Sequence, residues 1–255
     1  MENKKIKNKK IVLQSNLENV INTSQLEKVG AGHDGIVFQY NNIALKLLKY
    51  DINLRKEKNL MTFEKILYFI NELTLKRIVK PIDIILDLEG VFCGYAMVFL
   101  NNLASEKKKG TSEYKDPGDF LCSDLDCASF ELSEDFTILT NKKVIAKDVN
   151  RGSYIYTENF MKLCDLDKFI YPNNIALSIS DTNQKMLNFT IAKFLYYEML
   201  KSGDFTKSEL KLISKWVKKA TNNIMFINEL SKEISTSLTE PISEYAKTKV
   251  KSIIK

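Results

Sequence analysis

The sequence has little arginine, histidine and cysteine, and each shortage excludes a class of protein. Only three of the 38 basic residues are arginines, so the net charge of +6 rests on lysine. Proteins that grip nucleic acid usually rely on arginine and on a concentrated basic face. We therefore expect no nucleic-acid partner.

Histidine and cysteine are too few and too scattered to predict a zinc site. His33 is the single histidine, and none of the four cysteines stands at C-x-x-C spacing from another. Structural zinc sites usually draw their ligands from such closely spaced pairs. Unpaired, reduced cysteines are typical of cytosolic proteins, so we predict a cytoplasmic location.

Long apolar runs are also missing. No stretch reaches the roughly 18 apolar residues of a membrane-spanning helix. The basic start MENKKIKNKK is followed by a mixed segment, without the apolar core of a signal peptide. With 44% hydrophobic and 27% charged residues, the composition is typical of a soluble globular protein, and no membrane partner is expected.

From about Leu26 to Leu100 the chain carries mostly strand signals. Four β-prone runs are predicted as strands: 35–40, 43–48, 78–87 and 91–100. Asn41-Asn42 joins the first two, and asparagine tolerates the positive φ of a tight hairpin turn. Glu89-Gly90 marks the turn between the last two. One helix is predicted within this region, because apolar residues recur at helical spacing on one face: Leu60, Phe63, Leu67, Ile70 and Leu73.

The remaining chain carries mostly helix signals. Residues 101–118 lack apolar periodicity and are rich in turn formers, which predicts a linker. Apolar residues from Leu121 to Leu139 then recur at three- and four-residue steps, which predicts a helix. The predicted parts are a polar N-terminal segment (1–22), a strand-rich lobe (23–100), the linker (101–118) and a helical lobe (119–255).

Residues 29–38, VGAGHDGIVF, contain three glycines at G-x-G-x-x-G spacing. A dinucleotide-binding triplet must open a helix, but the residues after Gly35 are β-branched and aromatic. A Walker loop would need Gly-Lys-Ser/Thr, which is absent. Two interpretations remain: a glycine-rich β-hairpin that covers phosphates, or a plain turn.

Val37, two positions after the third glycine, and the A-L-K run at 44–46 decide between them. The pattern G-x-G-x-x-G-x-V followed by A-x-K resembles the protein kinase family. The resemblance implies that the glycine loop and Lys46 bind the phosphates of ATP. It implies a gatekeeper at Met97 and a hinge after it. The nucleotide-binding residues so implied are Gly30, Ala31, Gly32, Gly35, Val37, Ala44, Lys46, Met97, Val98, Phe99 and Leu100.

Further positions match the family downstream. In protein kinases a helix glutamate holds the lysine, and Glu64 takes this place, with a solvated helix charge as the alternative. Residues 144–169, VIAKDVNRGSYIYTENFMKLCDLDKF, resemble the catalytic loop and metal-binding segment, with a short hairpin between. The resemblance makes Asp148 the catalytic base and Asp165 a Mg²⁺ ligand, with Ser153 at the second metal position. Residues 188–203 resemble the central helix of the second lobe.

Several positions depart from the family pattern. Ala146 and Lys147 replace the histidine and arginine of H-R-D, and Asn150 stands where Ser/Thr kinases carry a lysine. Ser153 replaces the asparagine that binds a second Mg²⁺. Asp167 replaces the glycine of D-F-G, and no A-P-E follows.

The resemblance implies a bilobal α+β protein-kinase-like fold with a reduced helical lobe. The implied function is that of a compact, microbial-type Ser/Thr protein kinase. It would use ATP and Mg²⁺ to phosphorylate a hydroxyl of a protein substrate. Two alternatives stay open: an inactive nucleotide-binding module, and a small-molecule phosphotransferase of the aminoglycoside or choline type.

Overall fold

The computed structural model describes residues 9–32, 34–49, 61–101, 123–149, 153–157, 161–171 and 179–190, with 206–208, 211 and 215. The chain divides into two compact units. The first consists of 1–75, 79–100 and 165–171, and the second of 76–78, 101–164 and 172–255. Of the predicted linker, only Asn101 lies within the described residues.

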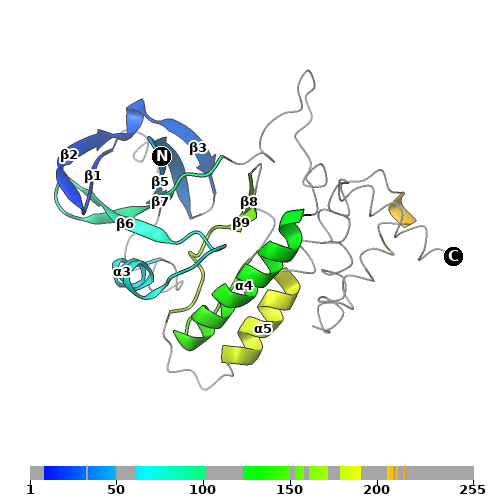
Figure 1. The fold of residues 1–255 in the computed structure, drawn as a ribbon. Coiled ribbons are helices and arrows are strands. Elements are labelled where there is room, and N and C mark those ends of the chain that lie inside the picture. The colour runs from blue at the N-terminus through cyan, green and yellow to red at the C-terminus, as the bar shows by residue number, and fades with distance from the viewer. Residues whose placement is uncertain are drawn as a thin grey trace. The chain divides into compact units, whose positions relative to one another are not determined.

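The first unit is built on a seven-stranded antiparallel sheet in the order β2-β1-β6-β7-β5-β4-β3 (Figure 1). Its strands are β1 (Lys10–Leu13), β2 (Asn16–Asn22), β3 (Glu27–Ala31), β4 (Gly35–Tyr40), β5 (Ile43–Leu48), β6 (Pro81–Asp87) and β7 (Phe92–Val98). A short 3-10 turn, η1 (Thr23–Gln25), joins β2 to β3.

The four predicted strands are confirmed as β4, β5, β6 and β7, although β6 begins only at Pro81. Both predicted turns are present as well. Asn41 has φ 51° and Gly90 has φ 77°, the left-handed conformation that these residue types tolerate best. The sequence did not predict β1 and β2. β1 is only four residues long, and the apolar residues of β2 are scattered among polar ones.

The apolar core of this unit lies on one face of the sheet. It consists of Ile11, Ile21, Ile36, Phe38, Leu45, Leu47, Ile85, Cys93 and Ala96. Successive side chains of a regular strand point to opposite faces. Lys46, between Leu45 and Leu47, therefore lies on the face opposite the core.

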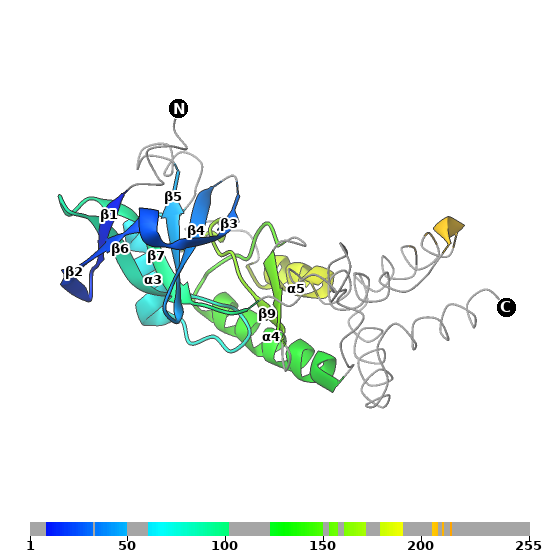
Figure 2. The ribbon, with the colours of Figure 1, turned by 90° about the horizontal axis from the view of Figure 1, so that it is seen from above.

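Helix α3 (Phe63–Glu72) packs against the β6 side of the sheet (Figures 1 and 2). Thr62 caps its first turn by accepting a hydrogen bond from the Lys65 N–H. The helix itself was predicted, but its buried face was not. Ile66 and Phe69 are buried, whereas Leu67, placed on the predicted apolar stripe, is 40% exposed.

The second unit contains two helices and one small hairpin within its described residues. Helices α4 (Ser123–Asn141) and α5 (Ile179–Thr190) pack against each other. Strands β8 (Tyr154–Tyr156) and β9 (Met161–Leu163) pair as the predicted hairpin. The helix predicted between Leu121 and Leu139 is confirmed as α4. Helix α5 covers only residues 188–190 of the helix predicted over 188–203, and the rest of that predicted helix lies outside the described residues.

A buried carboxylate ties residues 76–78 into the second unit. Asp135, on α4, accepts hydrogen bonds from the backbone N–H groups of Lys76, Arg77 and Ile78, at 2.7 to 2.8 Å. Arg77 also donates to the carbonyl of Met161 at 3.0 Å.

The described residues therefore form an α+β structure dominated by one antiparallel sheet. None of the helices placed within them has both the length and the apolar character that crossing a bilayer requires.

Candidate functional site

The glycine triplet forms the predicted hairpin between β3 and β4. The two strands pair from Glu27 to Ala31, and the Gly32 N–H donates to the Gly35 carbonyl at 3.0 Å. A Cβ at Gly35 would lie 2.6 Å from the carbonyl oxygen of Leu47, so the close pairing with β5 requires glycine there. His33, between Gly32 and Asp34 in the sequence, lies outside the described residues.

Strand register aligns one row of residues across the sheet, leading from the glycine hairpin to its centre. Gly30 pairs with Val37, Val37 with Lys46, Lys46 with Tyr95, and Tyr95 with Ile84. Residues directly opposite each other on antiparallel strands share a face. The hairpin, the lysine and the tyrosine therefore belong to one surface.

Lys46 contacts two carboxylates at the centre of this row. Its ammonium nitrogen lies 2.7 Å from Oδ1 of Asp165 and 2.5 Å from Oδ2 of Asp167. Both carboxylates belong to the same compact unit as Lys46. Lys46 and Asp165 belong to separate sequence motifs 119 positions apart, and the fold brings them into direct contact.

Asp167 has partners besides Lys46, one at its carboxylate and one at its backbone. The Tyr95 hydroxyl donates to its Oδ1 at 2.7 Å, and the Lys65 amine donates to its backbone carbonyl at 2.9 Å. We call Lys46, Lys65, Tyr95, Asp165 and Asp167 the lysine–aspartate cluster.

Burial and charge act in opposite directions on these groups. Burial alone would lower the pKa of Lys46, but the charges around it, those of Asp167 and Asp165 among them, raise it well above its ordinary value. Burial raises the pKa of Asp167, which the Lys46 ammonium counteracts. Burial lowers the pKa of Lys65 to about 8, against the opposing charge of Asp167.

Glu64, predicted to hold Lys46, is not its partner. Glu64 is exposed in the first turn of α3. The positive end of the helix dipole stabilises a carboxylate at this place. Its neighbour Lys65 is buried and reaches Asp167. The apolar face of α3 is rotated relative to the predicted stripe, and this rotation turns residue 65 inward and residue 64 outward.

The segment that carries both aspartates is anchored to the first unit by buried apolar residues. Leu166, Phe169 and Ile170 are all buried, and Tyr171 packs on Tyr68 of α3 with ring centroids 4.4 Å apart. Asp165 itself adopts φ 74°, an uncommon conformation for a residue other than glycine. The anchored segment holds this aspartate beside the lysine.

The residues predicted to contact adenine follow the lysine along the same strands. Ala44 pairs with Met97, two positions from the Lys46–Tyr95 pair and therefore on the same face. Val98 ends β7 and is 49% exposed. The Phe99 N–H donates to the Asn42 carbonyl at 3.0 Å, so this predicted hinge donor is already engaged. Leu100 is half-buried.

Asp148, the predicted base, lies in the second unit. It is exposed and has φ 57°. The backbone just before it is fixed by Asn183, a buried residue of α5. Its side chain accepts from the Ala146 N–H at 2.9 Å and donates to the Val144 carbonyl at 2.8 Å. Asn188, further along α5, accepts a hydrogen bond from Gln184 instead.

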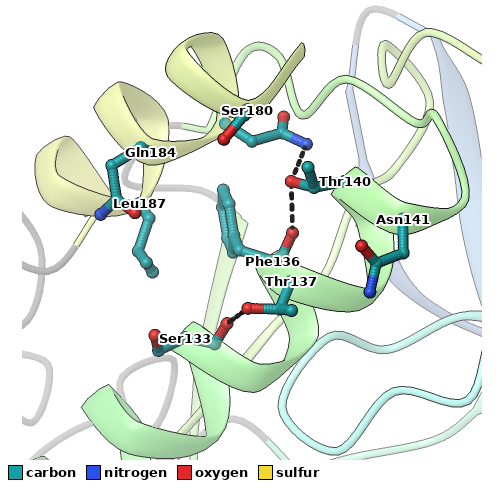
Figure 3. Close-up of a pocket in the computed structure, with 9 residues that line it drawn as sticks. Ser133, Phe136, Thr137, Thr140, Asn141, Ser180, Gln184 and Leu187 are labelled. Atoms are coloured by element: carbon teal, nitrogen blue, oxygen red, sulfur yellow. Dashed lines mark hydrogen bonds between the residues drawn. The ribbon is translucent and has the colours of Figure 1, made fainter.

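Asn183 also lines a hollow of about 240 Å³ between α4 and α5 (Figure 3). Its amide donates to Thr140, whose hydroxyl donates in turn to the Phe136 carbonyl. On the α5 side the wall includes Gln184 and Leu187. The Asn183 side chain, which fixes the backbone just before Asp148, is therefore also part of the wall of this hollow.

Ser153, the predicted second metal position, is buried at the start of the β8–β9 hairpin. Its carbonyl accepts a hydrogen bond from the Cys164 N–H at 2.6 Å. Asp165 follows directly in sequence. Among the described residues, no group of three or more His, Cys, Asp or Glu side chains is arranged to hold a metal ion.

The chain matches no model of a protein family, and it has no match among curated proteins.

Proposed function

We propose that this chain is a phosphotransferase of the protein-kinase type, with the bilobal fold of that family. It would transfer the γ-phosphoryl group of ATP to a Ser/Thr hydroxyl of a protein. The observation that carries the proposal is the 2.7 Å contact between Lys46 and Asp165. The resemblance gives these two residues neighbouring roles, on the phosphates and on the metal.

Backbone conformation supports the same assignment. Four described residues other than glycine have positive φ: Asn41, Lys143, Asp148 and Asp165. Asn41 and Lys143 lie in turns that end a strand and a helix. The other two are the aspartates named for catalysis and metal binding. Such conformations are costly and tend to cluster at functional sites, where the surrounding structure imposes them.

The donor set also fits the proposed cofactor. Mg²⁺ prefers oxygen ligands and is commonly held by one or two carboxylates together with substrate phosphates, so it needs no all-protein cage. Asp165 supplies such a carboxylate, and its side chain is 40% exposed. When bound, the ion would neutralise charge on the phosphates. Lys46 would add a second positive charge, and the glycine hairpin would offer backbone N–H groups.

Asp148 has the chemistry required of the catalytic base. An exposed carboxylate can orient a substrate hydroxyl and accept its proton, provided that its backbone is fixed. The Asn183 bonds to Val144 and Ala146 fix the backbone immediately before it.

The test is phosphoryl transfer from γ-labelled ATP with Mg²⁺ to a generic protein substrate, for the parent chain and for Asp148→Ala and Asp165→Ala. Each substitution should lower the transfer rate at least about 100-fold. Asp148→Ala should leave the affinity for ATP unchanged. Glu89→Gln, which removes an exposed carboxylate at the β6–β7 turn, is the matched control and should retain full activity.

Three results would contradict the proposal in different ways. A parent chain whose melting temperature does not respond to ATP has no nucleotide site. ATP binding without any transfer would identify an inactive binding module. Transfer to an aminoglycoside or to choline, with none to protein, would identify a small-molecule phosphotransferase.

A further inference from the structure

We infer that Asp167 is the positioning residue for Lys46, taking over the task that the kinase family gives to a helix glutamate. Tyr95 and Lys65 in turn fix Asp167. The ligand concerned is a nucleoside triphosphate, whose phosphates Lys46 would contact. The inference rests on the proposed function for that ligand, but the contacts themselves do not depend on it.

The two carboxylates beside Lys46 differ in burial. The side chain of Asp165 is 40% exposed, whereas that of Asp167 is 2% exposed. An exposed carboxylate can turn toward a ligand and release the lysine at small cost. A buried one that left its cation would remain without a partner in a poorly solvated site. Asp167 therefore keeps Lys46 in place when Asp165 engages a ligand.

Asp167 is itself held at both its side chain and its backbone. The Tyr95 hydroxyl occupies Oδ1 at 2.7 Å, which leaves Oδ2 directed at the Lys46 ammonium. Burial, and then the charge of Asp167, raise the pKa of Tyr95 well above its ordinary value, so the hydroxyl stays a donor. Tyr95 pairs with Lys46 across β5 and β7, so strand register sets the distance between donor and lysine.

Helix α3 contributes a cation where the family pattern expects an anion. Lys65 is buried, and its amine lies 2.9 Å from the Asp167 carbonyl. A lysine in this place cannot pair with Lys46, because like charges repel. By binding the backbone of Asp167, it helps to orient the carboxylate that does pair with Lys46.

The experiment compares binding of ATP and of adenosine by calorimetry, for Asp167→Asn and for the milder Tyr95→Phe. Asp167→Asn should weaken ATP binding at least about tenfold and leave adenosine binding unchanged, because Lys46 contacts only the phosphates. Tyr95→Phe should change both affinities in the same directions, by a smaller factor. Glu64→Gln, the rival carboxylate, and Glu89→Gln, the matched control, should change neither affinity.

A second measurement needs no nucleotide. The rate at which an amine-reactive reagent acylates Lys46, followed by mass spectrometry, should rise several-fold in Asp167→Asn and stay unchanged in Glu64→Gln. A buried, ion-paired ammonium is a poor nucleophile, and loss of the paired charge exposes it to reaction.

The outcomes separate the two hypotheses. If Asp167→Asn weakens ATP and adenosine binding equally, or if acylation of Lys46 responds only to Glu64→Gln, the positioning role is overturned. If the parent chain does not bind ATP but acylation responds to Asp167→Asn, the proposed function fails and the assignment of the lysine's partner holds.

Discussion

In the second unit, Asp135 is fully buried and accepts three backbone hydrogen bonds. In the first unit, Asp167 is 1% exposed and contacts the side chains of Lys46 and Tyr95. Burial raises the pKa of both carboxyls. For Asp135 the three N–H groups counteract the rise, and for Asp167 the Lys46 ammonium does so first.

The difference lies in what the partners can do. Backbone N–H groups of residues 76–78 cannot turn away without unfolding the segment, so Asp135 has a structural role. The partners of Asp167 are side chains, a lysine ammonium and a tyrosine hydroxyl, which can change their other contacts without unfolding the backbone. Asp167 can therefore hold the Lys46 ammonium while the other contacts of that ammonium change. Burial alone therefore does not separate a structural carboxylate from a functional one.

The largest expected effect is on the structural side of this comparison. Asp135→Ala should lower the free energy of unfolding by about 3–5 kcal/mol, because three N–H groups lose their acceptor and each unsatisfied buried donor costs about 1–3 kcal/mol. Asp135→Asn keeps one acceptor oxygen and should lose less. Urea unfolding followed by circular dichroism measures both. Equal stability of Asp135→Ala and the parent chain would remove the basis for a structural role.

Gly94→Ala should disturb the functional side without altering any charge. A Cβ at Gly94 would lie 2.1 Å from the Lys46 carbonyl oxygen, so β5 and β7 must separate beside the lysine. We expect the free energy of unfolding to fall by about 3 kcal/mol, which is in the upper part of the range for overpacking. A Cβ at Gly32 would have no other atom within 4 Å, so Gly32→Ala is the control and should leave stability unchanged. Equal unfolding midpoints for the two variants would contradict the claim that β5 and β7 are too close at Gly94 to accept a Cβ.

The smallest expected effect concerns the dependence of stability on pH. The pKa of Lys65 is about 8 in the folded chain, below its ordinary value of 10.5. The unfolded chain therefore binds more protons between these two values, and stability should rise with pH in that window. From pH 7.5 to 9.5 the titration of Lys65 should raise the free energy of unfolding by about 2 kcal/mol.

The variant Lys65→Met isolates this contribution. The free energy of unfolding of the parent chain, measured relative to that of Lys65→Met at several pH values, should rise with pH through the window. A pH-independent difference would mean that Lys65 is not held in a site that disfavours its charge.

Local features of the fold could be predicted from the sequence because they depend on local chemistry. The turns at Asn41 and Gly90 need residues that tolerate positive φ, and the β-branched run after Gly35 cannot open a helix. Strand β5 then follows from its apolar run. Lys46 stands between Leu45 and Leu47 in that run and therefore points to the opposite face.

The partner of Lys46 could not be predicted in the same way. Helix α3 has apolar side chains on several faces, so periodicity alone did not show that Ile66 would be buried and Leu67 exposed. Adjacent helical residues point about 100° apart, so this ambiguity decides whether residue 64 or 65 faces inward. Asp167 was named only as a departure from a motif, because its contact with Lys46 is made between distant parts of the chain.

The position of β1 has a consequence for the order in which the sheet can form during synthesis. Ile11 pairs with Asp87, which the ribosome adds 76 residues later. At about 5–20 residues per second, this delay lasts about 4–15 s. Until then β1 has only β2 beside it, and an isolated two-stranded hairpin is marginally stable. In the mostly exposed β2, Asn16, Glu18, Asn19 and Asn22 interrupt the apolar residues, so this strand offers no long apolar run for aggregation before β6 arrives.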